Sequence, residues 1–278
     1  MKRLILLITL AMPLLLASET RAQDEDFYIY LCFGQSNMEG YPGIPDEYKG
    51  PVDPRFQVLA AVDFPKLDRE KGQWYTAVPP LSRPGAGLSP ADFFGRSLVE
   101  QLPPEKRVGV INVAVGGTRI ELFDEKTKDD YLANAPGWLL NTVKHYDNEP
   151  YQRLVELGRL AKKDGVIKGI LLHQGESNTG DAAWPSKVKV IYENLLHDLE
   201  LKADEVPLIA GQVVAADQNG KCASMNAIID TLPQTVPTAR VVSAEGCPDL
   251  SDDLHFSPEG YRMLGERYAA AALETLEK

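Results

Sequence analysis

Beyond residue 88 the chain alternates between short apolar segments typical of buried strands and longer segments with helical periodicity. The strand-like segments are 108–115, 166–172, 207–214 and 240–244, and the helix-like segments are 89–102, 151–163, 186–201, 223–232 and 258–276. An apolar run at 27–33 precedes them and adds another strand. The sequence therefore predicts an α/β fold, a three-layer α/β/α sandwich whose central, mostly parallel sheet has about five strands, because strands that alternate with helices form parallel sheets covered on both faces.

The segment 41–88 does not share this alternation. It contains many glycines and prolines and has no clear periodicity apart from 56–62. We interpret it as an inserted loop region over the edge of the sheet that carries the functional site, and not as a second domain. No internal repeat or low-complexity linker divides the rest of the chain. Residues 23–278 are therefore expected to form a single domain.

The N-terminus has the pattern of a secretory signal peptide. Lys2 and Arg3 precede an apolar stretch at 4–16, and residues 20–22 offer a small-residue cleavage site. The apolar stretch is shorter than a bilayer-spanning helix, and no cysteine stands at the cleavage position to carry a lipid anchor. We therefore expect residues 1–22 to be removed and the mature protein to be secreted or periplasmic, without a membrane anchor.

The chain carries an excess of acidic residues, with a net charge of −11. Removal of residues 1–22 takes away three basic residues and one acidic residue, which brings the net charge to −13. Nucleic acids and anionic membranes are bound by basic surfaces, so neither is expected as a partner. The composition is compatible with a neutral substrate and does not indicate an oligomeric state.

Three cysteines, Cys32, Cys222 and Cys247, bear on redox state and cofactors. Cys32 lies inside the first predicted strand and is expected to be buried. In an oxidising compartment Cys222 and Cys247 can pair or remain free, and the sequence leaves both alternatives open. The cysteines have no metal-ligand spacing, and the chain contains no His-Glu-x-x-His, calcium-loop or P-loop motif. No metal or other cofactor is therefore expected.

A serine follows the first predicted strand, in the block GQSNMEG at 34–40. On a glycine-flanked turn at the carboxyl end of a strand, its hydroxyl faces the edge where open α/β sheets build their sites. The block differs from the Gly-x-Ser-x-Gly elbow of the α/β-hydrolases, since its second glycine comes four residues after Ser36. Ser36 is therefore a candidate nucleophile that needs a base, an acid and an oxyanion hole.

Four histidines are available as the base. His197 lies in a helical segment, His145 lies in a polar connection, and His173 ends a strand among residues that suggest a supporting role. His255 lies in a polar loop between the last strand and the terminal helix, at the edge of the sheet that carries the serine. Asp252 precedes it by three residues, so one turn can aim the carboxylate at the imidazole Nδ1. We therefore predict His255 as the base and Asp252 as the acid that orients it.

Donors for an oxyanion hole are expected after two other strands. Gly116 and Gly117 follow the strand at 108–115, and glycine lets a backbone N–H approach a ligand closely, although a tight turn would also need it. Gln174 comes just after the strand at 166–172 and offers a side-chain amide to the same oxygen. Glu176 has two readings, as a structural carboxylate that fixes the loop or as a second acid partner for His255.

These segments resemble the sequence blocks of the SGNH (GDSL-type) hydrolase superfamily, in the branch that includes acetylxylan esterases of carbohydrate esterase family six and sialate O-acetylesterases. The blocks are Gly34-Gln35-Ser36-Asn37-Met38, Ala114-Val115-Gly116-Gly117-Thr118, His173-Gln174-Gly175-Glu176-Ser177-Asn178 and Asp252-x-x-His255. The resemblance implies a flavodoxin-like sandwich and a secreted serine esterase that removes O-acetyl groups from plant polysaccharides such as acetylxylan. A sialate O-acetylesterase and a catalytically inactive carbohydrate-binding relative are the alternatives.

The resemblance also implies a role for each site residue. It assigns the nucleophile, base and acid to Ser36, His255 and Asp252, and the oxyanion hole to the N–H groups of Ser36 and of Gly116 or Gly117 together with the side chain of Gln174. Glutamine stands there where the wider superfamily has asparagine. The third block opens with Leu172 and His173 where relatives often have a tryptophan, which leaves the substrate preference open.

Aromatic side chains outside the predicted strands are candidates for a sugar platform, because their rings can stack on sugar faces. They are Trp74, Trp138, Trp184, Tyr41 and Tyr131. Tryptophans in loops also bury against the fold, so each of these has a structural alternative. We favour Trp184 because it closely follows the third block, and we expect acetylated carbohydrate as the partner.

Overall fold

The central sheet contains seven strands in the order β3-β2-β4-β1-β5-β6-β7. The computed structural model describes residues 23–41 and 43–276, so the expected signal peptide at 1–22 lies outside the described residues. The strands are β1 (Asp24–Gly34), β2 (Phe56–Leu59), β3 (Trp74–Thr76), β4 (Arg107–Ala114), β5 (Gly165–His173), β6 (Leu208–Gly211) and β7 (Arg240–Val242). β3 is antiparallel to β2, and the other neighbouring strands are parallel. The sheet is therefore mostly parallel, as expected, with β1 at its centre.

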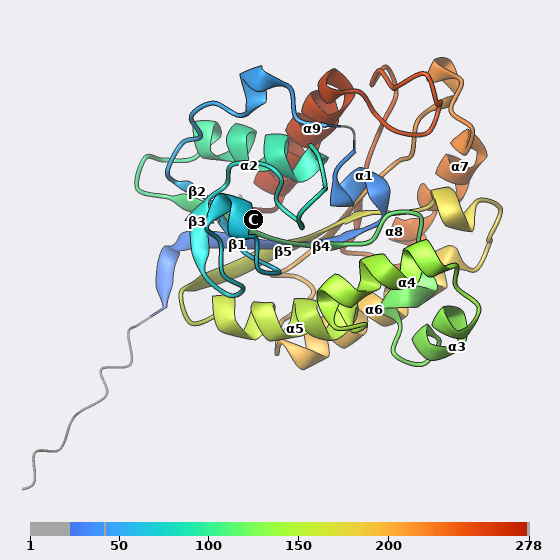
Figure 1. Ribbon diagram of the computed structural model, residues 1–278, viewed down its shortest axis with the longest axis horizontal. Coiled ribbons are helices and arrows are strands. Elements are labelled where there is room, and N and C mark those ends of the chain that lie inside the picture. Colours follow the sequence, from blue (N-terminus) through green and yellow to red (C-terminus); the bar gives the residue numbers. More distant parts are fainter. Residues whose placement is uncertain (1–22, 42, 277–278) are drawn as a thin grey trace, which may run out of the picture.

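Helices cover both faces of this sheet (Figure 1). They are α1 (Ser36–Glu39), α2 (Pro90–Gln101), α3 (Lys128–Ala133), α4 (Gly137–Val143), α5 (Pro150–Ala161), α6 (Trp184–Asp198), α7 (Asn226–Ile229), α8 (Leu232–Thr235) and α9 (Pro258–Leu276). Side chains alternate along β1, so that Ile29, Leu31 and Phe33 share a core with α5 and α6. Tyr30 and Cys32 face the opposite core, which is shared with α2 and α9. The predicted three-layer α/β/α sandwich is confirmed.

Short elements account for the differences from the sequence prediction. The segment 41–88 is not only a loop, because it supplies β2 and β3, and the prediction of about five strands is therefore too low. β2 lies within 56–62, the one part of this segment with a clear pattern, whereas β3 has only three residues and carries too little periodicity to be recognised. The expected helix at 223–232 is also wrong in extent. The structure has a short 3₁₀ turn followed by α7 and then by α8, which has Pro233 in its first turn, where its missing N–H is tolerated.

The carboxyl ends of β4, β1 and β5 lie side by side at one edge of the sheet. From β1 the chain continues to β2 on one side, whereas from β5 it continues to β6 on the other. Connections that diverge in this way leave a crevice beyond the strand ends, where open α/β sheets bind their ligands. The segment 243–257, between β7 and α9, reaches the same edge of the sheet.

Candidate active site

Close packing between β1 and β5 sets the position of Ser36. A Cβ atom on Gly34 would lie 2.0 Å from the carbonyl oxygen of His173, so only glycine allows the two strand ends to approach this closely. The backbone N–H of Gln35 donates to the same carbonyl oxygen at 3.0 Å. The chain then turns directly into α1, whose first residue is Ser36. The serine therefore stands at the carboxyl end of the central strand, as predicted.

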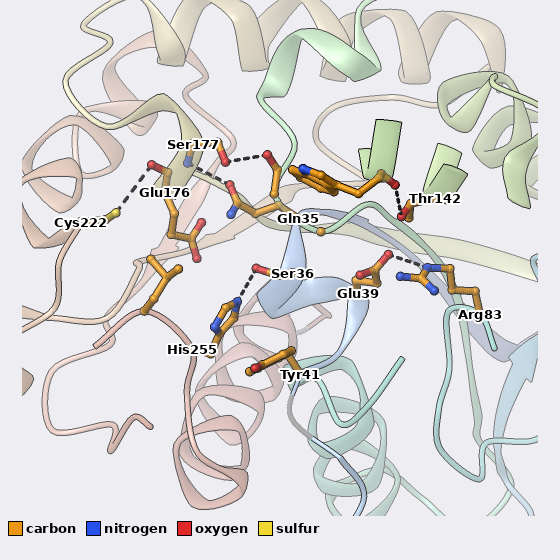
Figure 2. Close-up of a pocket in the computed structure, with 14 residues that line it drawn as sticks. Gln35, Ser36, Glu39, Tyr41, Arg83, Thr142, Glu176, Ser177, Cys222 and His255 are labelled. Atoms are coloured by element: carbon orange, nitrogen blue, oxygen red, sulfur yellow. Dashed lines mark hydrogen bonds and ion pairs between the residues drawn. The ribbon is translucent and has the colours of Figure 1, made fainter. Parts of the chain in front are cut away.

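Ser36, His255 and Asp252 form a continuous chain of hydrogen bonds. His255 Nε2 lies 2.9 Å from Ser36 Oγ, and His255 Nδ1 lies 2.7 Å from Asp252 Oδ2 (Figure 2 shows the imidazole facing the serine). A carboxylate only accepts hydrogen bonds, so Nδ1 carries the proton and Nε2 is free to accept from the serine hydroxyl. The structure thus brings together the three residues that the sequence selected, in an arrangement that can activate a serine hydroxyl.

Hydrogen bonds from residues of its own loop favour the ionised form of the Asp252 carboxyl. Burial alone would raise the pKa of its carboxyl, but hydrogen bonds from the His255 ring and from the backbone N–H groups of His255 and Leu254 outweigh this effect. The pKa of Asp252 is therefore lower than usual. Its Oδ1 accepts the N–H of Leu254 at 3.1 Å and that of His255 at 3.0 Å. One carboxylate thus fixes both the backbone and the ring of the histidine.

Backbone donors beside the serine can form an oxyanion hole. The N–H of Ser36 is the first of α1 and has no acceptor within that helix. Among residues 23–41 and 43–276, the N–H groups of Gly116 and Gly117 also have no hydrogen-bond acceptor. A Cβ atom on Gly116 would lie 3.6 Å from Ser36 Cβ and 2.8 Å from Glu39 Oε2, which shows how closely this backbone approaches the serine.

Gln174 does not face the site, which corrects the expectation that its amide donates to the oxyanion. Its side chain is fully buried, and Nε2 donates to Asn178 Oδ1 at 2.7 Å and to Gln35 Oε1 at 3.1 Å. A third, longer bond at 3.3 Å reaches the carbonyl oxygen of Thr118. Because these acceptors already use the amide protons, Gln174 joins the strand-end loops to one another and has no proton left to donate into the cavity.

Glu176 contacts the serine turn rather than the histidine ring. Its Oε1 accepts a hydrogen bond from Asn37 Nδ2 at 2.6 Å, whereas Nδ1 of His255 is occupied by Asp252. Of its two readings, the geometry favours a structural carboxylate and gives no support to Glu176 as a second acid partner of the base.

The predicted sugar platform at Trp184 is wrong. Trp184 is fully buried in the core on the α5 and α6 side of the sheet, and its Nε1 donates to Gln174 Oε1 at 2.5 Å. The exposed aromatic residues of the site are Trp138, with 57% of its surface exposed, and Tyr41, with 46%. The ring centroids of Tyr41 and His255 are 4.1 Å apart. Loop position alone did not distinguish these aromatic residues, because their burial depends on what packs against them.

A cavity of about 600 Å³ opens above Ser36 (Figure 2). The segment 41–88 contributes to its wall, as expected, through Tyr41 and Arg83. Sequence reasoning missed the partly buried pair of Arg83 and Glu39, whose Nε and Oε1 atoms lie 2.7 Å apart. It also assigned no role to Asn37, although that residue stands next to Ser36 in the first block.

The three cysteines are free thiols. Cys32 and Cys247 are buried, whereas Cys222 is partly exposed and lines the cavity. The sequence left open whether Cys222 and Cys247 pair, and in the structure they do not. The Sγ of Cys222 lies 3.6 Å from the carbonyl oxygen of Glu176.

Comparison with known proteins identifies the family of the chain. Residues 26–274 match the family model described as carbohydrate esterase, sialic acid-specific acetylesterase. A probable carbohydrate esterase of Arabidopsis thaliana is 26% identical over 261 residues, which cover 88% of this chain and 90% of the relative.

Solved structures share the fold. An X-ray structure of an Arabidopsis thaliana protein superposes with a TM-score of 0.68 at 22% identity, covering 89% of this chain and 98% of that one. NanS gives a TM-score of 0.62 at 19% identity, with 92% and 99% covered. A carbohydrate acetylesterase from Xanthomonas citri gives 0.61 at 20% identity, with 89% and 56% covered. Since the family model matches nearly the whole described chain, this protein belongs to the family of carbohydrate esterases described as sialic acid-specific acetylesterases.

Proposed function

We propose that the chain is a serine carbohydrate O-acetylesterase in which Ser36 Oγ attacks the acetyl carbonyl carbon. His255 Nε2 accepts the hydroxyl proton, and Asp252 stabilises the imidazolium that results. The bond from the carbonyl carbon to the sugar oxygen then breaks, and the imidazolium donates its proton to that oxygen. Water attacks the acetyl-enzyme with His255 again as base, so that acetate leaves and Ser36 is restored. The observation that carries this proposal is the hydrogen-bond chain from Asp252 through His255 to Ser36.

The negative charge on the carbonyl oxygen would be stabilised by backbone donors. The N–H groups of Ser36, Gly116 and Gly117 are held in place by the strand ends and are not used by other described residues. Fixed donors of this kind stabilise the transition state more than the ground state, because the charge develops only as the hydroxyl attacks.

For the substrate, we propose a neutral acetylated sugar such as the acetylated xylose units of acetylxylan. The exposed rings of Trp138 and Tyr41 offer flat apolar surfaces for sugar rings. The positive charge of Arg83 is compensated by Glu39, and the carboxylate of Glu176 also lines the cavity. The fixed charges of the wall therefore favour a neutral sugar over an anionic one.

An acetylated sialic acid is the second candidate, supported by the description of the family. Acetate release from acetylated xylan and from O-acetylated sialic acid, measured side by side, distinguishes the two substrates. A higher kcat/KM on the sialic acid would reverse the order of the candidates and leave the esterase chemistry in place.

Replacement of Ser36 tests the enzymatic proposal itself. Ser36→Ala should lower kcat for 4-nitrophenyl acetate by about 10⁵-fold or more, as losses of serine nucleophiles do. Circular dichroism and the thermal midpoint should remain those of the wild type. Ser97→Ala on α2 is a matched control and should retain full activity, because among the described residues the side-chain hydroxyl of Ser97 bonds with Gln101 of its own helix. Substantial activity in Ser36→Ala would refute the proposal.

A catalytically inactive carbohydrate-binding relative is the alternative from another functional class. A fluorophosphonate probe decides between them, because it labels a serine only when a base activates the hydroxyl. We expect stoichiometric labelling of Ser36 in the wild type and none in Ser36→Ala. Absence of labelling in the wild type would favour the binding protein.

We also propose that residues 1–22 direct export and that 23–278 form one domain. The described chain begins its first strand at Asp24, directly after the expected cleavage site. Within residues 23–41 and 43–276, no helix has the length and apolar character needed to cross a membrane. N-terminal sequencing of the exported protein should give Gln23 as the first residue, and an intact N-terminus would contradict cleavage.

A further inference from the structure

The side chain of Asn37 binds the backbone on both sides of His255. Its Nδ2 donates to the carbonyl oxygen of Leu254 at 3.1 Å, and its Oδ1 accepts the N–H of Phe256 at 3.3 Å. Leu254 and Phe256 are the residues directly before and after the histidine. Asn37 itself follows Ser36 in α1, so a single buried amide connects the serine turn to the histidine loop.

Two further partners fix the orientation of this amide. Asn37 Nδ2 donates to Glu176 Oε1 at 2.6 Å, and Oδ1 accepts the hydroxyl of Tyr261 at 2.7 Å. A carboxylate accepts hydrogen bonds, so the nitrogen must face Glu176 and the oxygen must face Tyr261. The amide therefore has four partners for its two protons and two lone pairs, and a rotated amide would lose its bond to the carboxylate.

The histidine loop needs such an anchor. His255 lies between β7 and α9, outside any helix or strand. Asp252 orients the ring from within the same loop, but that contact does not fix the loop relative to Ser36. Asn37 supplies a direct hydrogen-bonded connection, because it belongs to the helix that begins with the serine.

We infer that Asn37 is a positioning residue that sets the distance from His255 Nε2 to Ser36 Oγ, with Glu176 and Tyr261 holding its amide in place. The inference rests on the proposed function, since it assumes that His255 takes the serine proton. A misplacement of about 1 Å at reacting groups can cost about 100-fold in rate. Loss of the hydrogen bonds from Asn37 to Leu254 and Phe256 should therefore lower kcat. KM should be unchanged, because the residues that line the cavity are retained.

Asn37→Asp is the first test, because aspartate has the same shape but cannot donate. It places a second carboxylate against Glu176 Oε1 and leaves the Leu254 carbonyl without its partner. We expect kcat for 4-nitrophenyl acetate to fall by about 30- to 100-fold with KM within about twofold. Glu176→Gln alone should cost less than about tenfold, because the glutamine oxygen can still accept from Asn37.

The double variant Asn37→Asp with Glu176→Gln provides the rescue. Its glutamine amide can donate to the new carboxylate, which restores the bond in the reverse direction and removes the repulsion. We expect kcat to recover at least about fivefold over Asn37→Asp, although both positions now differ from the wild type. A role in stability alone would move the unfolding midpoint in all these variants without this recovery of kcat.

Asn226→Asp is the matched control. The side-chain amide of Asn226 also forms two hydrogen bonds with the backbone. Its Oδ1 accepts the N–H of Val213 at 2.9 Å, and its Nδ2 donates to the carbonyl oxygen of Val213 at 3.0 Å. Asn226 does not line the cavity. Its replacement should lower the unfolding midpoint and leave the kcat of the folded protein unchanged. If Asn37→Asp fails to fold, Tyr261→Phe removes the hydroxyl that donates to Oδ1 and should lower kcat by about fivefold.

The inference is overturned if folded Asn37→Asp keeps its kcat, if the double variant shows no recovery, or if Tyr261→Phe, used in its place, keeps wild-type kcat. These outcomes are separate from failure of the proposed function. Activity that survives in Ser36→Ala would refute the proposed function, whereas activity that depends on Ser36 but not on Asn37 refutes the positioning role alone.

Discussion

Ser36 Oγ and His255 Nε2 lie 2.9 Å apart although 219 positions separate the two residues in the chain. Ser36 follows the central strand β1, and His255 stands just before α9, which covers the face of the sheet formed by Tyr30 and Cys32. Packing of α9 on the sheet therefore brings the loop before it over the end of β1. The contact between the serine and the histidine is therefore a consequence of the sandwich.

Asp252→Asn should lower kcat far more than Glu176→Gln. Asparagine can present its NH₂ group to Nδ1 and so favour the wrong tautomer of His255, for which a loss of about 10³- to 10⁴-fold is expected. Glu176 contacts Asn37 and not the imidazole, so its replacement should cost less than about tenfold. Steady-state kinetics with 4-nitrophenyl acetate measure both. A larger loss of kcat in Glu176→Gln than in Asp252→Asn would assign the acid role to Glu176.

Trp138→Ala should weaken binding of sugar without affecting the chemistry. The loss of an exposed stacking surface should raise KM for acetylated oligosaccharides by about tenfold, corresponding to about 1.4 kcal/mol, with kcat for 4-nitrophenyl acetate within about twofold. Val190→Ala is the control, because Val190 is also exposed but does not line the cavity. Equal KM values in both variants would exclude Trp138 as a platform.

Trp184→Phe should lower the stability of the protein. It removes the indole N–H from Gln174 Oε1 and leaves that buried acceptor without its donor, which should lower the free energy of unfolding by about 1–3 kcal/mol. Urea denaturation measures the change. Trp138→Phe serves as the exposed comparison and should remain within about 0.5 kcal/mol of the wild type. If Trp184→Phe is as stable as Trp138→Phe, the bond to Gln174 contributes nothing.

Cys222 should be the one thiol that reacts in the native protein. Cys32 and Cys247 are buried, and burial raises the pKa of both thiols, so their thiolates are scarce and shielded. An aromatic disulfide reagent should modify Cys222, fill part of the cavity and lower the esterase activity, and Cys222→Ser should be insensitive to it. A mass lower by two hydrogens and no reactive thiol would instead indicate a disulfide.

Stability at low pH should depend on Glu121. Burial alone would raise the pKa of this carboxyl, but hydrogen bonds from Lys187, Asn178 and Arg119 lower it to about 2. Because this pKa lies below that of the unfolded chain, the carboxylate contributes stability that is present above about pH 4.5 and is lost as the pH falls toward 2. Glu121→Gln should therefore destabilise the protein more at pH 6 than at pH 3.5 in urea denaturation. An equal loss at both values would contradict this assignment.

The α/β class, β1 and the chemistry-bearing blocks could be predicted from the sequence because their signals are local. Apolar runs mark the long parallel strands, and Ser89 followed by Pro90 marks the start of α2. The edge strand β3 could not be predicted, because so short a strand is defined by the partner it pairs with. The pattern at 56–62 was visible, but its place in the sheet as β2 depends on pairing with β3 and β4. The burial of Trp184 and the exposure of Trp138 could not be predicted either, because both depend on residues that are distant in the sequence.

The sequence by itself determined which residue types are available for the chemistry and the strand ends at which they stand. Ser36 was identified by its position after the first strand, His255 by elimination among four histidines, and Asp252 because it precedes His255 by three residues. Only the tertiary structure decided the orientation of the polar side chains around them. It turned Gln174 inward, set Trp138 in the cavity wall and placed the amide of Asn37 across the histidine loop. Those contacts join segments more than one hundred positions apart in several cases, and such distances are set by the packing of the whole sandwich.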